Sequence, residues 1–465
     1  MRARAWLGVT LAAVACARVS DGRAPEGMRA LWVDPQAAEV GEGSREHPFR
    51  DIRDALAVSG PKRVYLAAGT YRGGFELSPA TELWGEGRAA VFVGTSSAAT
   101  LMVASSAVLR GLTLRGEGTV VELRGGVTVL EDCRLETQSA ESKGLRVAPG
   151  TTALLKAVEF SGPFRRAIEV VSGASLEASG TRFAGTGTAV HLVGGRAVLR
   201  RTEIGAGAKA GPGVFCATGA LRLEQVSVQG HEYGLLTRAQ CQLEGIKLTV
   251  SGAWRAGVSL VETRGQLTEL SVADSGSYGG VQLVGSNMRL ERFQVQRSEA
   301  YGISARGGRL LLLDGEVALV RDHGGSAGDG IHARAGRVEV RSVTVRSVEG
   351  VGLLAAQQAQ VTGRGLVLQA TRAAGLLAET GARVSLSDTA LDRTQGPALV
   401  VPGDAQVRLD SVEASGPVGA GLFIDCARGA RVEVSDWRGE SYGLALPCVR
   451  RSEKVPTPLG ADGGR

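Results

Sequence analysis

The stretch Gly280–Val295, with the sequence GVQLVGSNMRLERFQV, decides the fold. Apolar side chains stand at alternate positions in three short pieces, and the last two pieces are separated by the two-residue bend Glu291-Arg292. Alternation with a period of two is typical of β-strands, because successive side chains of a strand point to opposite faces. The stretch therefore predicts three short strands that each have one apolar face. The apolar positions are Val281, Leu283, Met288, Leu290, Phe293 and Val295.

The opening step of this stretch, usually a glycine followed by two apolar residues at alternate positions, recurs along most of the chain. The intervals run from 20 to 24 residues, with one exception of 28. A fixed period in this range is the signature of a solenoid, whose units bury their apolar faces only against their neighbours. The first apolar residues of the units are Leu101, Val121, Leu145, Ile168, Val190, Val214, Leu235, Val258, Val281, Ile303, Ile331, Leu353, Leu376, Leu399, Leu422 and Leu444.

No segment inside a unit is long enough for a helical crossover, so equivalent strands of successive units are expected to pair in parallel. The repeat therefore predicts an all-β chain that forms a single-stranded parallel β-helix of about 16 coils of about 23 residues. At roughly 4.8 Å per coil, such a rod is on the order of 75 Å long. A leucine-rich repeat is the nearest alternative, but its Asn/Cys-centred consensus is missing, since the chain contains one asparagine, Asn287.

The two ends of the chain differ from the repeats. Residues 1–15 begin with Arg2 and Arg4 and continue with an apolar run, which is the pattern of an export signal. Cys16 follows three small residues, so two outcomes stay open: ordinary signal-peptidase cleavage, or lipidation of Cys16 as in a bacterial lipoprotein. We expect residues 16–30 to form a tether and residues 449–465 to form a disordered tail. No later segment has 18 consecutive apolar residues, so we expect no transmembrane span.

Residues 31–87 precede the regular repeats, and we expect them to form an N-terminal cap within a β-helix domain of residues 31–448. Ile52, Ala55 and Leu56 stand at helical spacing, and Gly60-Pro61 follows as a helix stop. An open parallel sheet edge invites pairing with other chains. A short amphipathic helix in front of the first coil therefore suits a capping role.

Short motifs in this region carry a resemblance to a known family: Val33-Asp34-Pro35, Pro48-Phe49, AGTY at 68–71 and LWGEG at 83–87. Together with the repeats, they resemble bacterial pectin-lyase-like β-helix proteins over residues 31–448. The resemblance implies a right-handed β-helix with three sheets, and it says little about activity because one fold hosts many functions. The chain departs from the family pattern at the two-residue bend, where it lacks the stacked asparagines and has, for example, Arg341-Ser342.

Charge and cysteine content argue against two classes of ligand. The formal net charge is +6, and basic and acidic residues are interleaved along the units. A nucleic-acid surface needs a basic stripe, and none is apparent in the sequence, so we expect no nucleic-acid partner. The chain has no C-x-x-C pair, so we expect no zinc site or other metal site, and we expect no cofactor.

The cysteine spacing predicts one disulfide. Cys426 and Cys448 are 22 residues apart, and each stands four residues after the first apolar residue of its unit. Equivalent positions on neighbouring coils lie roughly 4.8 Å apart, within the reach of a disulfide. Cys216 and Cys241 stand two and six residues after the first apolar residues of their units, so we expect no bond between them.

The single interval of 28 residues places an insertion at 321–329, with the sequence RDHGGSAGD. Enzymes of the family that the chain resembles carry their chemistry on the outer face of one sheet, beside the loops that precede it. Aspartate and histidine side chains together can serve acid–base chemistry. A glycine-rich surface loop is also where insertions are simply tolerated, so both interpretations stay open. The candidate catalytic residues are Asp322, His323, Asp329 and His332.

Each of the four coils before the insertion carries an aromatic residue in the turn that leads into its first strand. Aromatic faces spaced along a rod can stack on sugar rings, with polar side chains alongside as hydrogen-bonding groups. The alternative is that the aromatics plug the turns and close the interior. The candidate ligand-binding residues are Tyr233, Trp254, Tyr278, Tyr301, Gln282, Ser304, Arg306 and Arg334.

The outward positions of the first strands after the insertion are apolar. A stripe of this kind is normally covered by a loop, by the tail or by a protein partner. The residues of the stripe are Leu354, Leu377, Val400 and Phe423.

These observations predict an exported protein of the cell envelope, in the periplasm, in the outer membrane or on the cell surface. We expect it to act as a carbohydrate-binding or structural module with polysaccharide as its ligand. The alternative is a polysaccharide lyase or glycoside hydrolase with its site at 321–332. The clustered aspartates of the lyase and polygalacturonase branches are not recognisable in the sequence, which favours a protein without catalysis.

Overall fold

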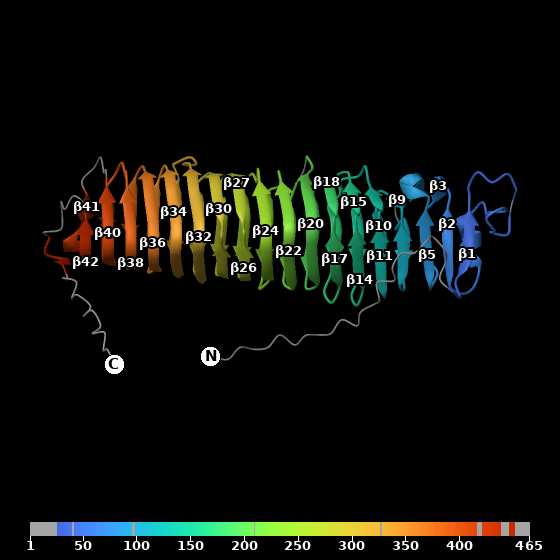
Figure 1. The fold of residues 1–465 in the computed structure, drawn as a ribbon, viewed down its shortest axis with the longest axis horizontal. Helices are drawn as coiled ribbons and strands as arrows, with labels where there is room; N and C mark the ends of the chain where they lie inside the picture. The colour runs from blue at the N-terminus through green and yellow to red at the C-terminus, as the bar shows by residue number, and fades with distance from the viewer. Residues whose placement is uncertain are drawn as a thin grey trace, which may run out of the picture.

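The computed structural model describes residues 26–39, 41–94, 98–208, 210–325, 328–415, 421–438 and 446–451. These residues form one elongated rod in which short strands stack coil upon coil, from the blue N-terminal end to the red C-terminal end (Figure 1). The strands pair in parallel, so the predicted all-β parallel β-helix is confirmed. The predicted signal segment, residues 1–15, and Cys16 lie outside the described residues.

In the described part of the chain, one side of the rod is a sheet of 16 strands that pair in register from one coil to the next. Its strands are β4 (Phe75–Leu77), β7 (Leu101–Val103), β10 (Thr119–Leu123), β13 (Lys143–Val147), β16 (Arg166–Val170), β19 (Thr188–Val193), β21 (Val214–Ala217), β23 (Tyr233–Arg238), β25 (Ala256–Val261), β28 (Gly279–Val284), β31 (Tyr301–Arg306), β33 (Asp329–Arg334), β35 (Val351–Ala356), β37 (Ala374–Ala378), β39 (Leu399–Val401) and β41 (Leu422–Ile424).

The other described strands form one 27-stranded sheet that bends around the rest of the coil, so the structure has two sheets where the resemblance implied three. Several of its strands run through the bend as one long strand, and others are divided there into two. They are β1 (Arg29–Val33), β2 (Lys62–Leu66), β3 (Gly69–Arg72), β5 (Thr81–Gly85), β6 (Ala90–Val93), β8 (Ala107–Arg110), β9 (Leu112–Arg115), β11 (Val127–Glu131), β12 (Arg134–Glu136), β14 (Thr152–Lys156), β15 (Glu159–Ser161), β17 (Ser175–Ser179), β18 (Arg182–Thr186), β20 (Arg196–Ala206), β22 (Ala220–Gln229), β24 (Gln242–Ser251), β26 (Arg264–Thr268), β27 (Ser271–Ser275), β29 (Asn287–Glu291), β30 (Gln294–Ser298), β32 (Arg309–Val320), β34 (Arg337–Val348), β36 (Gln360–Thr371), β38 (Arg383–Asp392), β40 (Gln406–Ser415), β42 (Arg431–Arg438) and β43 (Val449–Arg451).

The predicted repeat series aligns coil by coil in the 16-stranded sheet. Leu101 pairs with Val121, and the same register continues without a break to Leu422. Leu444, the last predicted member, lies outside the described residues. The sheet still has 16 strands, because β4, inside the predicted cap region, already pairs with β7.

The interior is one continuous hydrophobic core. Val281, Leu290 and Val295 have no exposed surface, and the other inward positions of the stretch 280–295 are buried as well, as predicted. Burying a Val, Leu or Phe side chain stabilises the fold by about 1.5–3 kcal/mol, and each coil repeats this several times. Stacking of the coils therefore supplies the buried apolar surface that one coil cannot supply alone.

The glycine that opens each unit has a packing reason. A Cβ atom at Gly280, Gly302 or Gly330 would lie 2.2 Å from Cγ1 of a valine on the opposite strand of the same coil, which is well inside contact distance. The backbone therefore lies closest to the opposite strand of the coil where the turn leads into the first strand. Glycine is the residue that fits there, because it has no Cβ atom.

The bend in the 27-stranded sheet uses a residue with left-handed backbone. Arg292, Ser342 and Ser411 have φ values of 51°, 53° and 53°, and Gly365 takes the same conformation in another coil. Asparagine tolerates this conformation better than most residues, which accounts for the asparagines of the family pattern. In this chain, the strand pairing on both sides of the bend holds arginine and serine in it.

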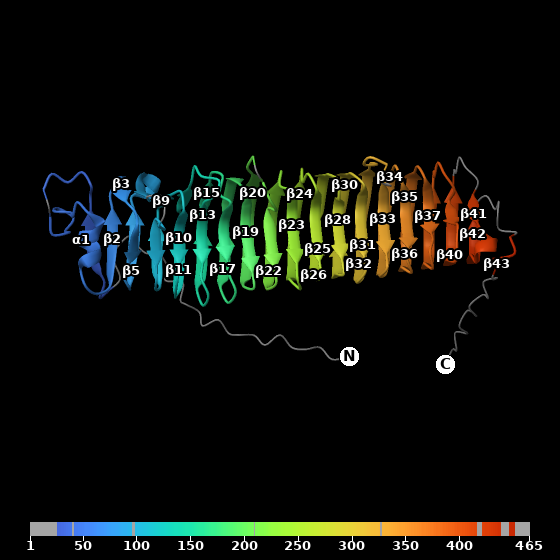
Figure 2. The same cartoon turned by 180° about the vertical axis from the view of Figure 1, so that it is seen from behind.

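A short helix, α1 (Ile52–Ala57), lies at the N-terminal end of the rod, as predicted (Figure 2). Asp51 caps the helix by accepting a hydrogen bond from the Arg53 backbone N–H, and Ile52 and Ala55 are buried in the core. None of the helices in the described part of the chain is long and apolar enough to cross a membrane.

The predicted boundaries shift at both ends of the rod. β1 begins at Arg29 because its backbone pairs with β2, so the last two residues of the predicted tether, 16–30, belong to the sheet. Residues 449–451 of the predicted tail, 449–465, form β43, since Val449 packs on the core and pairs with Val432. Residues 452–465 lie outside the described residues.

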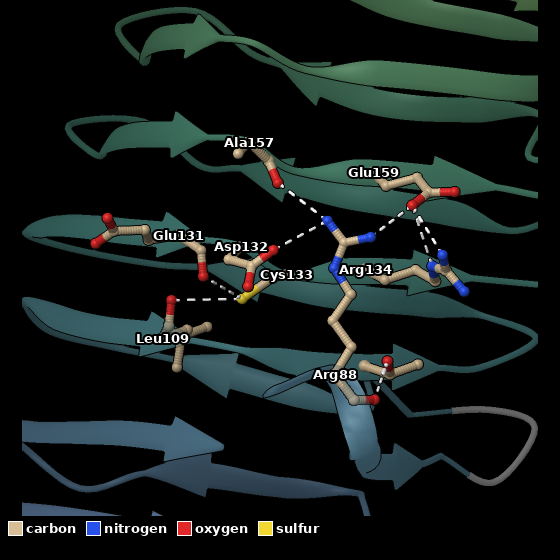
Figure 3. Close-up of polar contacts among 9 residues, drawn as sticks. Arg88, Leu109, Glu131, Asp132, Cys133, Arg134, Ala157 and Glu159 are labelled. Atoms are coloured by element: carbon tan, nitrogen blue, oxygen red, sulfur yellow. Dashed lines mark hydrogen bonds and ion pairs between the residues drawn. The ribbon is translucent and has the colours of Figure 1, made fainter. Parts of the chain in front are cut away.

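A polar latch ties the N-terminal region to later coils (Figure 3). Arg88, in the 3₁₀ turn η1 (Gly87–Ala89), places one guanidinium nitrogen 3.1 Å from Oδ1 of Asp132 and another 2.6 Å from Oε2 of Glu159. Arg134 binds the same Glu159 oxygen at 3.0 Å. One carboxylate therefore holds two arginines that are far apart in the sequence.

Cys133 follows Asp132, which contacts Arg88, and is the one free cysteine in the described part of the chain (Figure 3). Burial raises the pKa of its thiol to about 12, so the thiol is protonated at neutral pH. It contacts the backbone carbonyls of Leu109 and Glu131, each at 3.4 Å. Cys133 is therefore an unreactive core residue in this environment.

The described part of the chain contains two disulfides. Cys426 and Cys448, the predicted pair, are bonded, with their Cα atoms 5.4 Å apart. The prediction that Cys216 and Cys241 stay unbonded is wrong, because they form a second disulfide with a Cα–Cα distance of 6.1 Å. The prediction considered only equivalent positions on neighbouring coils. This bond instead runs diagonally, from strand β21 to the corner just before β24 in the next coil.

Candidate functional site

The outer face of the 16-stranded sheet carries one column of outward residues, with neighbours in register from coil to coil. Its character changes along the rod from charged to aromatic, then to polar, and finally to apolar. The column is Glu122, Arg146, Glu169, His191, Phe215, Leu236, Ser259, Gln282, Ser304, His332, Leu354, Leu377, Val400 and Phe423.

The structure divides the four predicted catalytic residues into two groups. Asp329 and His332 are buried together on β33, with Oδ2 of Asp329 2.7 Å from Nδ1 of His332. Asp322 and His323 are exposed in the insertion: Asp322 accepts a hydrogen bond from the Gly325 N–H, and Nδ1 of His323 lies 2.8 Å from Glu299. The insertion therefore does not bring the four side chains together.

The Asp329–His332 pair is held from several sides. The other Asp329 oxygen, Oδ1, accepts a hydrogen bond of 2.9 Å from the Val351 backbone N–H, and the Arg334 Nε–H donates to Nε2 of His332 at 2.6 Å. The ring of Tyr301, from the preceding coil, meets the His332 ring edge to face at 5.0 Å. All polar atoms of the pair thus have a partner.

These contacts define the tautomer of His332. Because Arg334 can only donate, Nε2 must accept, so neutral His332 carries its proton on Nδ1 and donates it to Asp329. An Asp–His pair of this kind can orient an imidazole for proton transfer. In this arrangement, however, the nitrogen that would take the proton is occupied by Arg334, so the pair becomes a base only if Arg334 moves.

The four predicted aromatics differ in exposure. Trp254 and Tyr278 are 53% and 43% exposed, in the turns that precede β25 and β28. The guanidinium of Arg255 lies between them, 5.2 Å from the Trp254 ring centre and 5.7 Å from that of Tyr278. Tyr233 instead is 8% exposed and packs with Leu236, and Tyr301 is half-buried against His332.

The predicted polar residues continue from these aromatics across the sheet. Gln282 and Ser304 occupy the outward column in two consecutive coils. Oε1 of Gln282 lies 3.2 Å from the hydroxyl of Ser259, a buried residue of the preceding coil that was not among the predicted residues. Arg306 and Arg334 are exposed neighbours at the ends of β31 and β33. We call Trp254, Tyr278, Gln282, Ser304 and Arg306 the polar strip.

The predicted apolar stripe is partly covered within the chain. Leu354 is buried in a small cluster with Val351 and Ala374, and Leu377 and Val400 are half-buried beside it. Phe423 is 56% exposed. A protein partner on this stripe stays a prediction.

The N-terminal part of the outer face holds a charge cluster that the sequence analysis did not select. Lys143 and Arg166 both bind the carboxylate of Glu169, with Nζ of Lys143 2.8 Å from Oε2. Burial lowers the pKa of the neighbouring His191 to about 4, and the charges of Arg166 and Lys143 add to the effect. His191 stacks on Phe215 with 4.7 Å between ring centres. Equal offsets in successive units are the signal that would have found this cluster.

A second feature lies on the 27-stranded sheet, where nine consecutive coils present arginine, glutamine or asparagine at the same register position. We call it the arginine–amide row. The expectation that the chain has no basic stripe was therefore wrong, because residues 22 to 28 positions apart look scattered in the sequence and are stacked in the fold. The row is Gln242, Arg264, Asn287, Arg309, Arg337, Gln360, Arg383, Gln406 and Arg431.

Among the described residues, no three His, Cys, Asp or Glu side chains lie close enough together to hold a metal ion.

Comparisons with known proteins find similarity in solved structures only. No family model and no curated protein matches the sequence. The catalytic domain of a GH87 α-1,3-glucanase in complex with nigerose matches with 11% identity over 92% of this chain and 69% of that chain, at a TM-score of 0.30. Tailspike protein 3 of bacteriophage CBA120 matches with 11% identity over 88% of this chain and 62% of that chain, at 0.33. Pectate lyase Pel9A matches with 11% identity over 67% and 75%, at 0.25. At these identities and TM-scores, the three solved structures say nothing about the activity of this chain.

Proposed function

We propose that this chain binds a polysaccharide along the outer face of the 16-stranded sheet, at the polar strip. The observation that carries the proposal is the pair of exposed aromatics, Trp254 and Tyr278, in consecutive coils with Arg255 between them. Exposed aromatic faces one coil apart suit stacking on successive sugar rings. Ser304, Gln282 and Arg306 stand alongside as hydrogen-bonding groups for sugar hydroxyls.

A glycan array on the purified chain tests this proposal. We expect binding to a subset of polysaccharides, and we expect Trp254→Ala with Tyr278→Ala to abolish it, since both exposed ring faces are removed. Phe423→Ala is the matched control, because Phe423 is equally exposed on the same sheet but lies outside the polar strip. Wild-type binding by the double aromatic variant would refute the proposal.

The second candidate function is a polysaccharide lyase or glycoside hydrolase. The observation that favours it is the buried Asp329–His332 pair beside Tyr301 on the outer face of the same sheet. Asp329→Ala with His332→Ala then abolishes release of oligosaccharides from the bound glycan and leaves binding in place. If a glycan that binds is never cleaved by the wild-type chain, this candidate is excluded.

We also propose that the protein is exported to the cell envelope, with or without a lipid on Cys16. The sequence of residues 1–16 supports export, and the disulfides Cys216–Cys241 and Cys426–Cys448 suit an oxidising compartment. Mass spectrometry of the mature N-terminus from the native host is the test. An acylated Cys16 identifies a lipoprotein, an unmodified N-terminus at or near Cys16 identifies a secreted protein, and a retained Met1 would contradict export.

A further inference from the structure

The arginine–amide row lies in a run of shallow pockets along the 27-stranded sheet. One pocket spans Arg196 to Gln266, the next contains Asn287, Arg309 and Arg337, and the last continues to Arg431. The last two share Gln360, and the first two meet where Arg264 pairs with Asn287. All nine positions of the row therefore line three successive pockets along the rod, and we call these three pockets together the depression.

This depression has a strong excess of positive charge. Its lining includes the arginines 196, 222, 264, 309, 337, 383, 408, 431 and 450, against two acidic residues, Glu244 and Glu433. Glu244 is already paired with Arg222. An unneutralised row of arginines of this kind attracts anions.

The arginines of the row are free of the ion pairs that are common elsewhere on this chain. In the described part of the chain, none of the five arginines of the row lies within 4.0 Å of a carboxylate oxygen. By contrast, Arg289 and Arg341, two coils apart on the same sheet, pair with Glu291 and Glu339. The guanidinium groups of the row are thus available to donate hydrogen bonds to a ligand.

The spacing of the row describes the ligand. Neighbouring coils are roughly 4.8 Å apart, which is close to the advance per sugar in an extended glycan. Arginines occupy about every second coil, with amides of Asn287, Gln360 and Gln406 between them. We propose that the row is a second polysaccharide-binding surface, specific for a linear acidic chain that turns one anionic group toward the rod at about every second sugar.

The lining of the depression argues against single-stranded nucleic acid as the occupant. Surfaces that bind single strands combine positive charge with aromatic platforms on which the bases stack. The residues that line the three pockets include no Phe, Tyr or Trp. Arginines with amides and no aromatics fit carboxylates or sulfates and sugar hydroxyls instead.

Calorimetric titration of the full chain tests the inference with four probes: hyaluronan oligosaccharides, oligogalacturonate, neutral cello-oligosaccharides and oligo(dT). We expect an acidic glycan to bind, with an affinity that falls as salt is added. Binding of hyaluronan would show that the ligand is a glycan with a carboxylate on every second sugar. Binding of oligogalacturonate would show that it is a glycan with a carboxylate on every sugar, of which alternate ones face the rod. Absence of binding by both, or stronger binding of oligo(dT), overturns the inference.

Two charge-matched variants locate the site. Arg309→Gln with Arg337→Gln should weaken binding about tenfold or more, because two adjacent charge-assisted contacts are lost. Arg341→Gln with Arg364→Gln removes the same charge from the same sheet outside the depression and should leave the affinity within about twofold. An equal loss in both variants would reduce the effect to net charge and sink the inference.

Trp254→Ala with Tyr278→Ala separates this surface from the polar strip. We expect that variant to bind the acidic glycan as the wild type does. If it loses acidic-glycan binding while Arg309→Gln with Arg337→Gln keeps it, the arginine–amide row is not the site and the proposed function of the polar strip stands.

Discussion

The Oγ1 atoms of Thr237 and Thr263 lie 2.5 Å apart, at the position that the Cys216–Cys241 disulfide occupies one coil earlier. Cys216 pairs in register with Thr237, and Cys241 and Thr263 each stand just before equivalent strands. One coil further on, the Ser286 hydroxyl donates to the Leu260 carbonyl at 3.0 Å in the same place. The corner between the two sheets is thus closed by a covalent bond in one coil and by hydrogen bonds in the next two.

This equivalence predicts that Thr237→Cys with Thr263→Cys forms a third disulfide. The backbone at these positions follows that of Cys216 and Cys241, whose Cα atoms are 6.1 Å apart. Closing a loop of this length stabilises a native state by about 3 kcal/mol, which should raise the midpoint of denaturation. Non-reducing peptide mapping detects the bond.

The control is Thr237→Cys alone, which removes the hydrogen bond and cannot form the bridge. We expect it to be slightly less stable than the wild type, since the Thr263 hydroxyl loses a partner but keeps its contact with the Val261 carbonyl. Two free thiols in the oxidised double variant would show that the two corners are not equivalent.

Val340→Asp tests the inward assignment of the repeat. Val340 has no exposed surface, and its strand, β34, pairs with β32 and β36 on both sides. An unpaired carboxylate in this stack should destabilise the chain by several kcal/mol. Ser385→Asp, at an exposed position of β38, should shift the denaturation midpoint little. Equal midpoints for Val340→Asp and the wild type would contradict the assignment.

The sequence predicted the fold well because the fold is one short pattern repeated. Val281 and Val340 follow a period of two inside a period of about 23, and both periods are visible without knowledge of any contact. Burial fixes the inward positions strongly, since a shift by one residue would expose the whole apolar set. The register of the 16-stranded sheet could therefore be predicted to the residue.

The surfaces could be predicted less well, because outward positions obey no such rule. Arg309 and Arg337 form part of a row only through stacking, and neither stands in a motif. The Cys216–Cys241 bond could not be predicted for a related reason. Cys216 lies within strand β21 and Cys241 lies at the corner before β24, so the two cysteines do not stand at equal offsets in their units. Tyr233 and Trp254 looked alike in the sequence, yet small differences in the turns bury one and expose the other.

The latch around Glu159 predicts a pH-dependent contribution to stability. Burial alone would raise the pKa of Glu159, but the hydrogen bonds and charges of Arg134 and Arg88 outweigh burial and hold that pKa below its usual range. A carboxylate with a lowered folded-state pKa stabilises the fold above its unfolded-state pKa of about 4.3. This stability is lost as the pH falls through the lower, folded-state value.

Glu159→Gln measures that contribution. We expect the variant to be less stable than the wild type by about 1–3 kcal/mol near pH 7, because two arginines lose their charged partner. The gap should narrow below about pH 4.3 as Glu159 becomes protonated in the wild type. Glu203→Gln is the control, since Glu203 pairs with Arg182 at a highly exposed site and should change stability little at either pH. A gap that stays constant with pH would show that Glu159 acts only through packing.

The Cys426–Cys448 disulfide predicts where unfolding begins when it is removed. The bond ties the turn after β41 to the segment before β43, and β43 pairs with β42 through Val449 and Val432. Terminal coils have a neighbour on one side only, so they fray first unless a crosslink holds them. Cys426→Ser with Cys448→Ser should therefore accelerate amide exchange in β41 and β42 and leave β28, in the middle of the rod, unchanged.

Cys216→Ser with Cys241→Ser is the matched control, because it removes a bond of similar loop length from a coil with neighbours on both sides. The two double variants separate local from global effects: faster exchange in β28 in the Cys426–Cys448 variant would mean that this bond stabilises the whole rod and not its last coil.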